Sequence, residues 1–436
     1  MPNLPTLKCT GCGVCVQSCR RNAISMSPSC QGFLYPSVNS AMCVSCGLCG
    51  KICPVNQAEK DKTVPAEKFS VREAYACAAL DEKIREESSS GGMFTVLAQK
   101  ILSDGGVVFG AEFDIDFSVR HGWTDNDAEL ERFRGSKYVQ GRTDGSFAKC
   151  REFLDSGRKV LFSGTPCQIA GLKAFLRNGY ENLICVDFIC HGVPSPFLWQ
   201  KYIGYREKKA ASRTVKTAFR RKNDGWKLYS LSFTFANDSE YRLPLTKDRY
   251  MQLFLKDNCL RESCYRCSFR GDNHKSDLTL ADFWGIENVL PASALQTPAL
   301  RTPVSSDSLS ETAPLGLGAS KFLDDKGTSL VIVQSEKGQK LLDSCSGNYV
   351  RTETDFMQAV SFNPSYFESK PQSRKRSQFY KDFERHSIDY LYRRFGHESP
   401  VAQGVRLIKR YALKICGVLF GKRNVNKIKK LIKGGD

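Results

Sequence analysis

Residues 158–196, RKVLFSGTPCQIAGLKAFLRNGYENLICVDFICHGVPSP, have the pattern of a strand, a turn, a helix and a second strand. The stretch is short enough to form one right-handed βαβ unit, in which both strands are parallel and end at the same edge of a sheet. Open α/β sheets bind their ligands at that edge. Cys167 follows the first strand near the start of the helix, and Cys190 follows the second strand. Neighbouring strands lie about 4.8 Å apart, so the two thiols can share one site.

The sequence on both sides continues this alternation. A buried strand is predicted at residues 105–114 (GGVVFGAEFD), and residues 92–106 place apolar side chains at helical spacing before two glycines. A strand and a helix follow again in residues 328–344, TSLVIVQSEKGQKLLDS. The predicted fold class is therefore an α/β (α+β) region, with residues 71–155 as its N-terminal part and residues 156–370 as its C-terminal part.

Three stretches stand apart from this alternation. Residues 58–70 are charged and contain one proline, as in a linker, and residues 289–320 are rich in Ser, Pro, Thr and Ala, as in a disordered insertion. Residues 371–436 form a basic tail with 17 Lys and Arg against 5 Asp and Glu, which carries +12 of the net charge of +18. Because the charge belongs mostly to the tail, nucleic acid is not the expected partner.

The bulk composition indicates a globular protein with metal-binding cysteines. The 436 residues suffice for two or three domains, and a hydrophobic content of 41% is normal for soluble proteins. The cysteine count of 19 is odd, and the N-terminus has no basic patch followed by an apolar run, so no secretory signal is visible. A reducing, cytoplasmic location is expected, where cysteines serve as ligands rather than as disulfides.

The tail contains one amphipathic stretch, residues 405–419, with apolar side chains near one helical face and basic ones mostly elsewhere. A basic amphipathic helix can lie on an anionic membrane surface, dock on a partner or pack on its own protein. No apolar run reaches the roughly 18 to 20 residues that span a bilayer. Membrane contact, if made, would thus be peripheral, at the inner face.

Residues 1–57 contain the spacing CxxCxxCxxxC twice, with a period of 34 residues. Bacterial two-cluster ferredoxins have this spacing, and in them three thiolates of each run hold one 4Fe-4S cluster while the fourth crosses to the other. Zinc sites, the alternative, take four ligands as two separated pairs. The repeat predicts cluster I, bound by Cys9, Cys12, Cys15 and Cys53, and cluster II, bound by Cys43, Cys46, Cys49 and Cys19.

A further CxxC, at Cys264 and Cys267, can complete a four-thiolate set with Cys167 and Cys190 and so hold a third 4Fe-4S cluster. The start of a helix also favours the thiolate of Cys167, although this residue can equally be a buried small side chain or a free reactive thiol. Cys259 competes as the fourth ligand, because CxxxxCxxC puts three thiols on one loop. The set without Cys259 is preferred.

Five motifs stand in the order expected of a known family. They are SSSGGMFTVLAQKILSDGG, RGSKYVQG, SGTPCQIAGLKAFL, ICHGVPSP and CYRCSFRGDNHKSDLTLADFWGIE. In this order the chain resembles the coenzyme F420 hydrogenase/dehydrogenase beta-subunit family, in its ferredoxin-fused bacterial form, over roughly residues 5–365. The resemblance implies FAD and a 4Fe-4S cluster, with the family's cluster ligands corresponding to Cys167, Cys190, Cys264 and Cys267.

Residues 88–92, SSSGG, precede a helix, where glycines admit a pyrophosphate close to the backbone and the helix N-terminus attracts phosphate. An N-cap with a flexible loop is the alternative. The basic turn at residues 133–142 suits a phosphate or an anionic flavin hydroquinone, and its alternative is an exposed turn without a ligand. The aromatic pair after Asp282 can line the flavin ring system or belong to the core. With the resemblance, the candidate flavin contacts are Ser90, Gly91, Gly92, Arg134, Lys137, Tyr138 and Asp282.

A flavin takes a hydride as two electrons and releases them singly to iron-sulfur centres. The leading hypothesis is therefore a flavin- and iron-sulfur-dependent oxidoreductase that connects a hydride carrier, coenzyme F420 or another, with one-electron carriers such as ferredoxin. A non-catalytic electron-transfer subunit of a larger redox complex is the alternative, and a zinc-stabilised nucleic-acid binder is a third hypothesis. The expected partner is a redox carrier protein or a partner redox subunit. No motif identifies the substrate or a catalytic residue.

Overall fold

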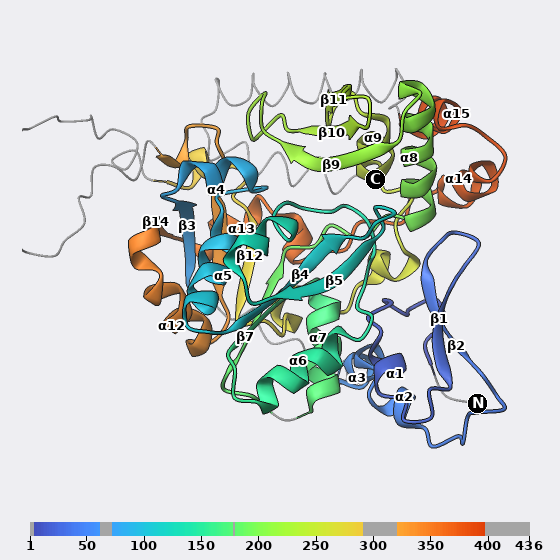
Figure 1. Cartoon of the computed structure of the whole chain (residues 1–436), viewed down its shortest axis with the longest axis horizontal. Coiled ribbons are helices and arrows are strands. Elements are labelled where there is room, and N and C mark those ends of the chain that lie inside the picture. The colour runs from blue at the N-terminus through green and yellow to red at the C-terminus, as the bar shows by residue number, and fades with distance from the viewer. Residues whose placement is uncertain (1–3, 62–71, 178, 291–320, 397–436) are drawn as a thin grey trace, which may run out of the picture.

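The computed structural model describes residues 4–61, 72–177, 179–290 and 321–396 (Figure 1). Most of the predicted linker, the predicted insertion from residue 291 and the tail from residue 397, including its amphipathic stretch, lie outside the described residues.

The predicted βαβ unit forms at the centre of the molecule. Its strands β7 (Val160–Ser163) and β8 (Leu183–Phe188) are adjacent and parallel. The helix α7 (Pro166–Leu176) between them begins with proline, which suits the first position of a helix. At its N-cap, Gln168 Oε1 accepts a hydrogen bond of 2.9 Å from the backbone N–H of Thr165. The predicted parallel pairing of the two strands is thereby confirmed.

One nine-stranded sheet contains this unit. Its central strands β12, β8, β7 and β4 are parallel, whereas β13 runs antiparallel to β12 and β5 runs antiparallel to β4. The mixed α/β class predicted from the sequence is confirmed. In spatial order the strands are β14 (Tyr349–Thr354), β3 (Ala74–Ala79), β13 (Ser329–Val333), β12 (Leu278–Asp282), β8, β7, β4 (Val107–Phe113), β5 (Val119–Thr124) and β6 (Gly141–Arg142).

Helices cover both faces of this sheet, so its central strands are buried on both sides. Leu161 of β7 packs in one core cluster, and its neighbours Val160 and Phe162 pack in another. This alternation follows from the two-residue period of a strand. The first face is covered by α4 (Glu82–Glu87), α5 (Met93–Ser103) and α12 (Glu336–Ser344), and the second by α6 (Ser146–Asp155), α7 and α13 (Phe356–Ser361).

A smaller antiparallel sheet lies beside the large one, above it in Figure 1. Its core is rich in aromatic side chains, among them Trp199, Phe219 and Tyr250. The sheet has the order β11 (Glu240–Pro244), β10 (Ser230–Phe235) and β9 (Thr214–Arg221), and it packs with α8 (Pro196–Ala210), α9 (Arg249–Leu255), α14 (Arg376–Phe383) and α15 (Ile388–Leu391).

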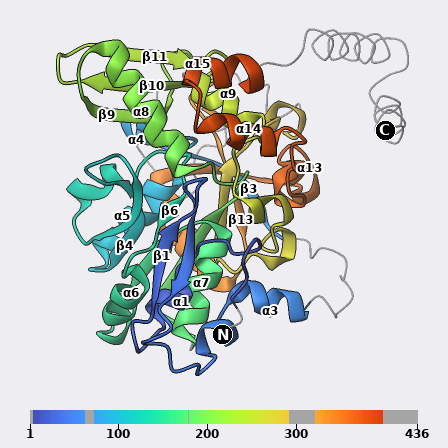
Figure 2. The same ribbon diagram turned by 90° about the vertical axis from the view of Figure 1, so that its right-hand side faces the viewer.

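The N-terminal cysteine repeat forms a small domain beside α6 and α7 (Figures 1 and 2). Its helices α1 and α3 both contact α7, so the domain lies against the second face of the large sheet. Its elements are α1 (Val14–Gln17), the hairpin of β1 (Ile24–Pro28) and β2 (Leu34–Val38), α2 (Leu48–Lys51) and α3 (Pro54–Asp61).

Short turns complete the described fold, and no helix within it is long and apolar enough to cross a membrane. The turns are η1 (Asp127–Arg132), η2 (Glu262–Arg266), η3 (Gly271–Asn273), η4 (Ile286–Asn288), η5 (Ser346–Asn348), η6 (Pro364–Tyr366) and η7 (Tyr392–Gly396).

Candidate functional site

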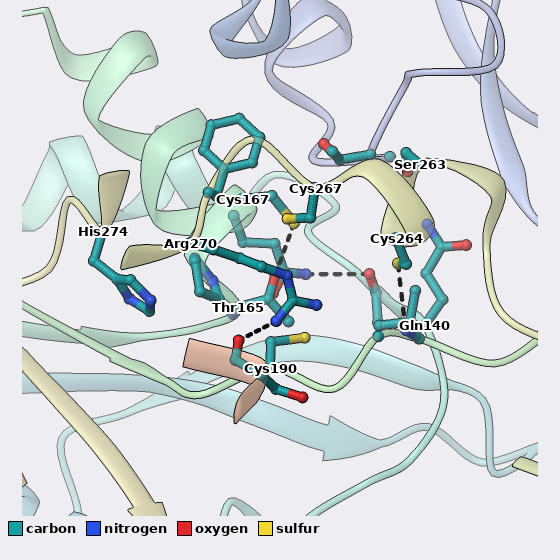
Figure 3. A pocket seen from close by; sticks show the side chains of 18 residues that line it. Gln140, Thr165, Cys167, Cys190, Ser263, Cys264, Cys267, Arg270 and His274 are labelled. Atoms are coloured by element: carbon teal, nitrogen blue, oxygen red, sulfur yellow. Dashed lines mark hydrogen bonds between the residues drawn. The ribbon is translucent and has the colours of Figure 1, made fainter. Parts of the chain in front are cut away.

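A pocket lies at the edge of the large sheet where β7 and β8 end (Figure 3). Two residues of the N-terminal domain, Thr10 and Gly11, also line it, so the pocket lies between that domain and the sheet. All four cysteines that the sequence groups into a third cluster site line this pocket: Cys167, Cys190, Cys264 and Cys267.

Three chain segments present these thiols: the start of α7, the segment after β8 and the loop at η2. Cys264 lies in η2 and Cys267 directly follows it. The loop before η2 is held against the segment after β8, because the N–H of Arg261 donates to the carbonyl oxygen of Val193 at 2.9 Å. Gly192 has a φ of 135°, and a Cβ added there would lie 3.2 Å from Cβ of Cys264. Glycine therefore permits the close approach of the two segments.

The buried surroundings favour neutral thiols as long as nothing positive is bound. Burial raises the pKa of Cys167 to about 12 and that of Cys264 to about 11, and it also raises the pKa of Cys190. The charge of Cys267 adds to each of these increases in pKa, so the four sulfurs lie near one another. A bound metal centre reverses the balance, because coordinating thiols are deprotonated.

Hydrogen-bond donors surround the sulfurs. The N–H of Val193 donates to Sγ of Cys264 at 3.5 Å. The hydroxyl groups of Thr10 and Ser263 line the same pocket. That of Thr10 lies beside the thiol of Cys167, and its hydrogen bond opposes the rise in pKa of that thiol. The hydroxyl of Ser263 is buried without a hydrogen-bond partner in the described structure. Buried polar groups normally have a partner, so both hydroxyls are placed to donate to a group bound among the cysteines. Thiolates with N–H and O–H donors around them suit an iron-sulfur cluster.

Four thiols in one pocket are a ligand set of the kind that a metal centre takes. Zinc binds all its sulfur ligands about 2.3 Å from one atom, whereas the thiolates of a 4Fe-4S cluster bind separate iron atoms.

Sequence reasoning missed two other side chains that line the pocket, Arg270 and His274. The guanidinium of Arg270 donates to the carbonyl oxygen of Ser365, and its charge opposes the effect of burial on the pKa of Cys190. His274 is held by Asp187, with 2.7 Å between its Nδ1 and Oδ2 of the carboxylate. Both residues follow the CxxC closely in sequence, and this proximity could have indicated that they lie near the pocket.

The eight cysteines of the N-terminal domain divide by exposure. The four predicted for cluster I are buried, with exposed fractions of 7–8%: Cys9, Cys12, Cys15 and Cys53. Of the four predicted for cluster II, Cys46 is exposed and the others are partly buried: Cys19, Cys43 and Cys49. The first set thus faces the interior of the molecule, and the second faces solvent.

Helix α7 connects the pocket with the first of these sets. Its first turn carries Cys167, and one turn later Gly171 lies so close to the N-terminal domain that an added Cβ would be 3.1 Å from Cβ of Cys12. Between them, Ala170 packs with Cys53 in a small apolar cluster that Cys167 also contacts. The two groups of cysteines are therefore neighbours across one helix.

Two protein-family models match the chain. The 4Fe-4S dicluster domain matches residues 8–57, and the model for the C terminus of the coenzyme F420 hydrogenase/dehydrogenase beta subunit matches residues 157–356. Residues 157–356 are thus similar to the C terminus of the F420 hydrogenase/dehydrogenase beta subunit. The second match contains all four pocket cysteines, and no curated protein matches the chain.

A solved structure is also similar to this chain. It is described as a xenon derivative of the F420-reducing [NiFe] hydrogenase complex from Methanosarcina barkeri. The two chains are 15% identical, and the alignment covers 65% of this chain and 82% of the other with a TM-score of 0.41.

Two residues predicted to contact a flavin, Tyr138 and Asp282, meet at Arg220 of β9, which sequence reasoning missed. Its guanidinium binds both carboxylate oxygens of Asp282, at 2.9 and 3.0 Å. It also donates to the hydroxyl of Tyr138 at 3.0 Å and to the carbonyl oxygen of Ser89 at 2.8 Å. Three segments far apart in sequence therefore meet at one buried arginine. In the sequence this arginine belongs to the basic run FRRK.

The glycine-rich loop before α5 packs tightly on the large sheet. The hydroxyl of Ser90 donates to the carbonyl oxygen of Thr328 at 2.7 Å. A Cβ added at Gly91 would lie 2.4 Å from the carbonyl oxygen of Cys77, and Gly92 has a φ of 88°. Both glycines are thus required for the approach of this loop to β3 and β13.

The predicted basic turn is held by contacts near it. Arg134 pairs with Glu87 and donates to the hydroxyl of Thr95 at 3.3 Å. Nζ of Lys137 lies 3.2 Å from the carbonyl oxygens of both Arg134 and Gly135. Burial lowers the pKa of Lys137 to about 7. These side chains lie beside the Arg220 group.

Other sequence alternatives are decided by packing. Cys259 is fully buried in the core of the smaller sheet and lies outside the pocket that the other four cysteines line. Of the aromatic pair after Asp282, Phe283 is core, and Trp284 stacks on Trp226 with 4.6 Å between ring centroids.

Proposed function

We propose that the chain carries electrons between the surface of its ferredoxin domain and the pocket at the sheet edge, as an iron-sulfur oxidoreductase. The observation that carries the proposal is the contact of the two cysteine groups through α7, with Cys12 against Gly171 and Cys53 in the apolar cluster that Cys167 contacts. Iron-sulfur clusters accept one electron each. Neighbouring sites of this kind form a path for electrons.

The pocket is proposed to bind a third 4Fe-4S cluster through Cys167, Cys190, Cys264 and Cys267. In support of this proposal, the site offers four thiols, two buried hydroxyls and the positive charge of Arg270. Each of these features stabilises negative charge on the sulfur atoms of a cluster.

A flavin is the second part of the proposal, and FAD would supply the exchange between hydride and single electrons. Its contacts would come from the region around Arg220, which includes Tyr138 and Asp282 and lies beside the loop at residues 88–92. The hydride carrier would be coenzyme F420 or another carrier of the same chemistry. A ferredoxin-like protein or a partner redox subunit would exchange single electrons.

Anaerobic purification with iron, sulfide and flavin measured together tests this proposal. We expect about twelve irons per chain from three clusters and one flavin. The double variant Cys264→Ser with Cys267→Ser should lose about four irons and keep the other eight. A matched control, Cys30→Ser with Cys150→Ala, changes two cysteines outside both cysteine groups and should lose none. Unchanged iron in the first variant would contradict a third cluster.

A non-catalytic electron-transfer subunit is the second candidate function. The tight packing of Gly91 and the pairing of Arg220 with Asp282 favour it, because these groups already satisfy one another. Purified protein that contains clusters but no flavin, and that is not reduced by hydride donors such as reduced F420 or NADH, would support this candidate.

A peripheral contact with the membrane is proposed for the basic tail, residues 371–436, on its charge and amphipathic pattern. Flotation with vesicles that contain anionic lipid tests it. Protein that binds these vesicles equally well after deletion of residues 397–436 would refute an anchoring role.

A further inference from the structure

The ferredoxin domain turns one cysteine set to solvent, and that face is partly apolar. Cys46 is exposed, and beside it in sequence Met42 and Val44 have exposed fractions of 42% and 62%. In Figure 1, α2, which contains Cys49, lies at the lower edge of the molecule. Exposed apolar side chains next to a redox site are suited to contact with another protein.

The charge of this domain has one sign. Residues 1–58 contain four Lys and Arg and no Asp or Glu, and the first acidic residue, Glu59, is paired with Lys8. The other three basic residues are exposed and form no ion pair within the described structure: Arg20, Arg21 and Lys51. Arg20 and Arg21 directly follow Cys19, and Lys51 stands two residues after Cys49. The basic side chains therefore accompany the exposed cysteine set.

We infer that this face, defined by Arg20, Arg21, Met42, Val44 and Lys51, docks an acidic protein that carries single electrons. This inference rests on the proposed function and names the chemistry of the partner. Apolar contacts at the centre would bring the redox groups close, and the basic residues around them would attract a negative partner and exclude a positive one. One electron leaves the carrier and enters the domain at the Cys19, Cys43, Cys46 and Cys49 site, without bond formation.

Reversal of the three charges tests the docking face. The variant combines Arg20→Glu, Arg21→Glu and Lys51→Glu in the full chain with its clusters. Stopped-flow spectroscopy would follow the electron from a dithionite-reduced acidic bacterial ferredoxin to the oxidised protein. We expect a second-order rate constant at least ~10-fold lower than in the parent protein at low salt, with the difference lost at high salt. The Kd of the oxidised ferredoxin, measured by titration calorimetry, should rise by a similar factor.

A basic c-type cytochrome provides a probe with the opposite sign. The reduced variant should reduce this cytochrome faster than the reduced parent protein does. The basic cytochrome is repelled by the basic face of the parent protein and attracted by the acidic face of the variant. The matched control reverses three exposed charges near the smaller sheet, Lys208, Arg213 and Lys216, and should leave both rates within about twofold. Equal rates and equal salt dependence in parent and variant would overturn the inference.

Two measurements separate this inference from the proposed function. The iron content of each variant shows whether its clusters are intact, and reduction by titanium(III) citrate, a small reagent, reports electron uptake without docking. A parent protein without clusters contradicts the proposed function, whereas a parent that accepts electrons with no effect of charge contradicts only the docking face. If the triple reversal does not retain iron, the neutral set Arg20→Gln, Arg21→Gln and Lys51→Gln replaces it, with an expected decrease of at least ~3-fold.

Discussion

Thr10 belongs to the first cysteine loop of the ferredoxin domain, yet its hydroxyl lines the pocket of the proposed third cluster. Thr10→Val keeps the shape of the side chain and removes the donor. Hydrogen bonds to cluster sulfur raise the reduction potential, and the loss of one worth about 1 kcal/mol corresponds to a potential about 40 mV lower for one electron. A redox titration followed by electron paramagnetic resonance measures this change.

A matched control exists for this substitution. Thr214 in β9 has a buried hydroxyl without a partner in the described structure, and it lies outside the pocket. Thr214→Val should leave all potentials unchanged, whereas Ser263→Ala should lower the same potential as Thr10→Val. Equal effects of the Thr10 and Thr214 variants would refute a bond from Thr10 to the cluster.

Lys137 provides a pH-dependent prediction at the same scale. Burial lowers its pKa from 10.5 to about 7. Below pH 7 the ammonium group of Lys137 is charged in both the folded and the unfolded protein, so its burial destabilises the folded protein by the full desolvation energy. Between pH 7 and 10.5 the folded protein binds fewer protons than the unfolded chain, so stability rises with pH in this window. Lys137→Met should therefore raise the free energy of unfolding below pH 7 by at least ~1 kcal/mol.

This advantage of Lys137→Met should shrink toward zero as the pH approaches 10, and thermal unfolding at several pH values would measure it. Lys216→Met, a change at an exposed lysine, is the control and should show no such trend. A difference between variant and parent protein that stays constant with pH would contradict the lowered pKa.

At the scale of the element, α7 is the contact between the two groups of cysteines. Gly171→Leu places a side chain where an added Cβ is already 3.1 Å from Cys12 and 3.4 Å from Phe147. Overpacking of this kind costs about 1–3 kcal/mol, and it should push the ferredoxin domain away from the helix. Electron transfer from cluster I to the pocket should slow, which rapid-mixing spectroscopy can follow, and the midpoint of thermal unfolding should fall.

Gly204 in α8 is the matched control, because nothing lies within 4 Å of a Cβ added there. Gly204→Leu should leave electron transfer unchanged and stabilise the helix by up to about 1 kcal/mol. If both variants gave the same change in stability and rate, the contact through α7 would not be the path.

At the scale of the whole molecule, cluster II is the most exposed of the three groups of cysteines. Cys46 is exposed, whereas the cysteines of cluster I are buried and those of the pocket lie between two domains. A chelator reaches buried iron only through local opening. Timed treatment with an iron chelator, followed by alkylation and mass spectrometry, should therefore label the peptide with Cys43, Cys46 and Cys49 first. Simultaneous labelling of all twelve cysteines would contradict this order.

Much of the fold could be predicted, because local patterns carry it. Apolar runs bounded by glycines predicted β4 and β7, and the length of the segment between β7 and β8 was enough to predict a parallel pair. The meeting of Cys167 and Cys190 in the pocket was also predictable, because the two strands that they follow are parallel and end at the same edge of the sheet. Arg220 and Thr10 were not predictable, because no local spacing connects them with the residues that they meet.

The sequence by itself determined the two cysteine repeats, the α/β alternation and the family resemblance, because periodicity and spacing are properties of neighbouring residues. Tertiary structure alone decided that Thr10 of the ferredoxin domain lines the pocket and that Cys259 does not. It also decided which cysteine set faces inward, through the close packing of Gly171 on Cys12. Such contacts join residues more than a hundred positions apart, and only the packing of whole elements brings them together.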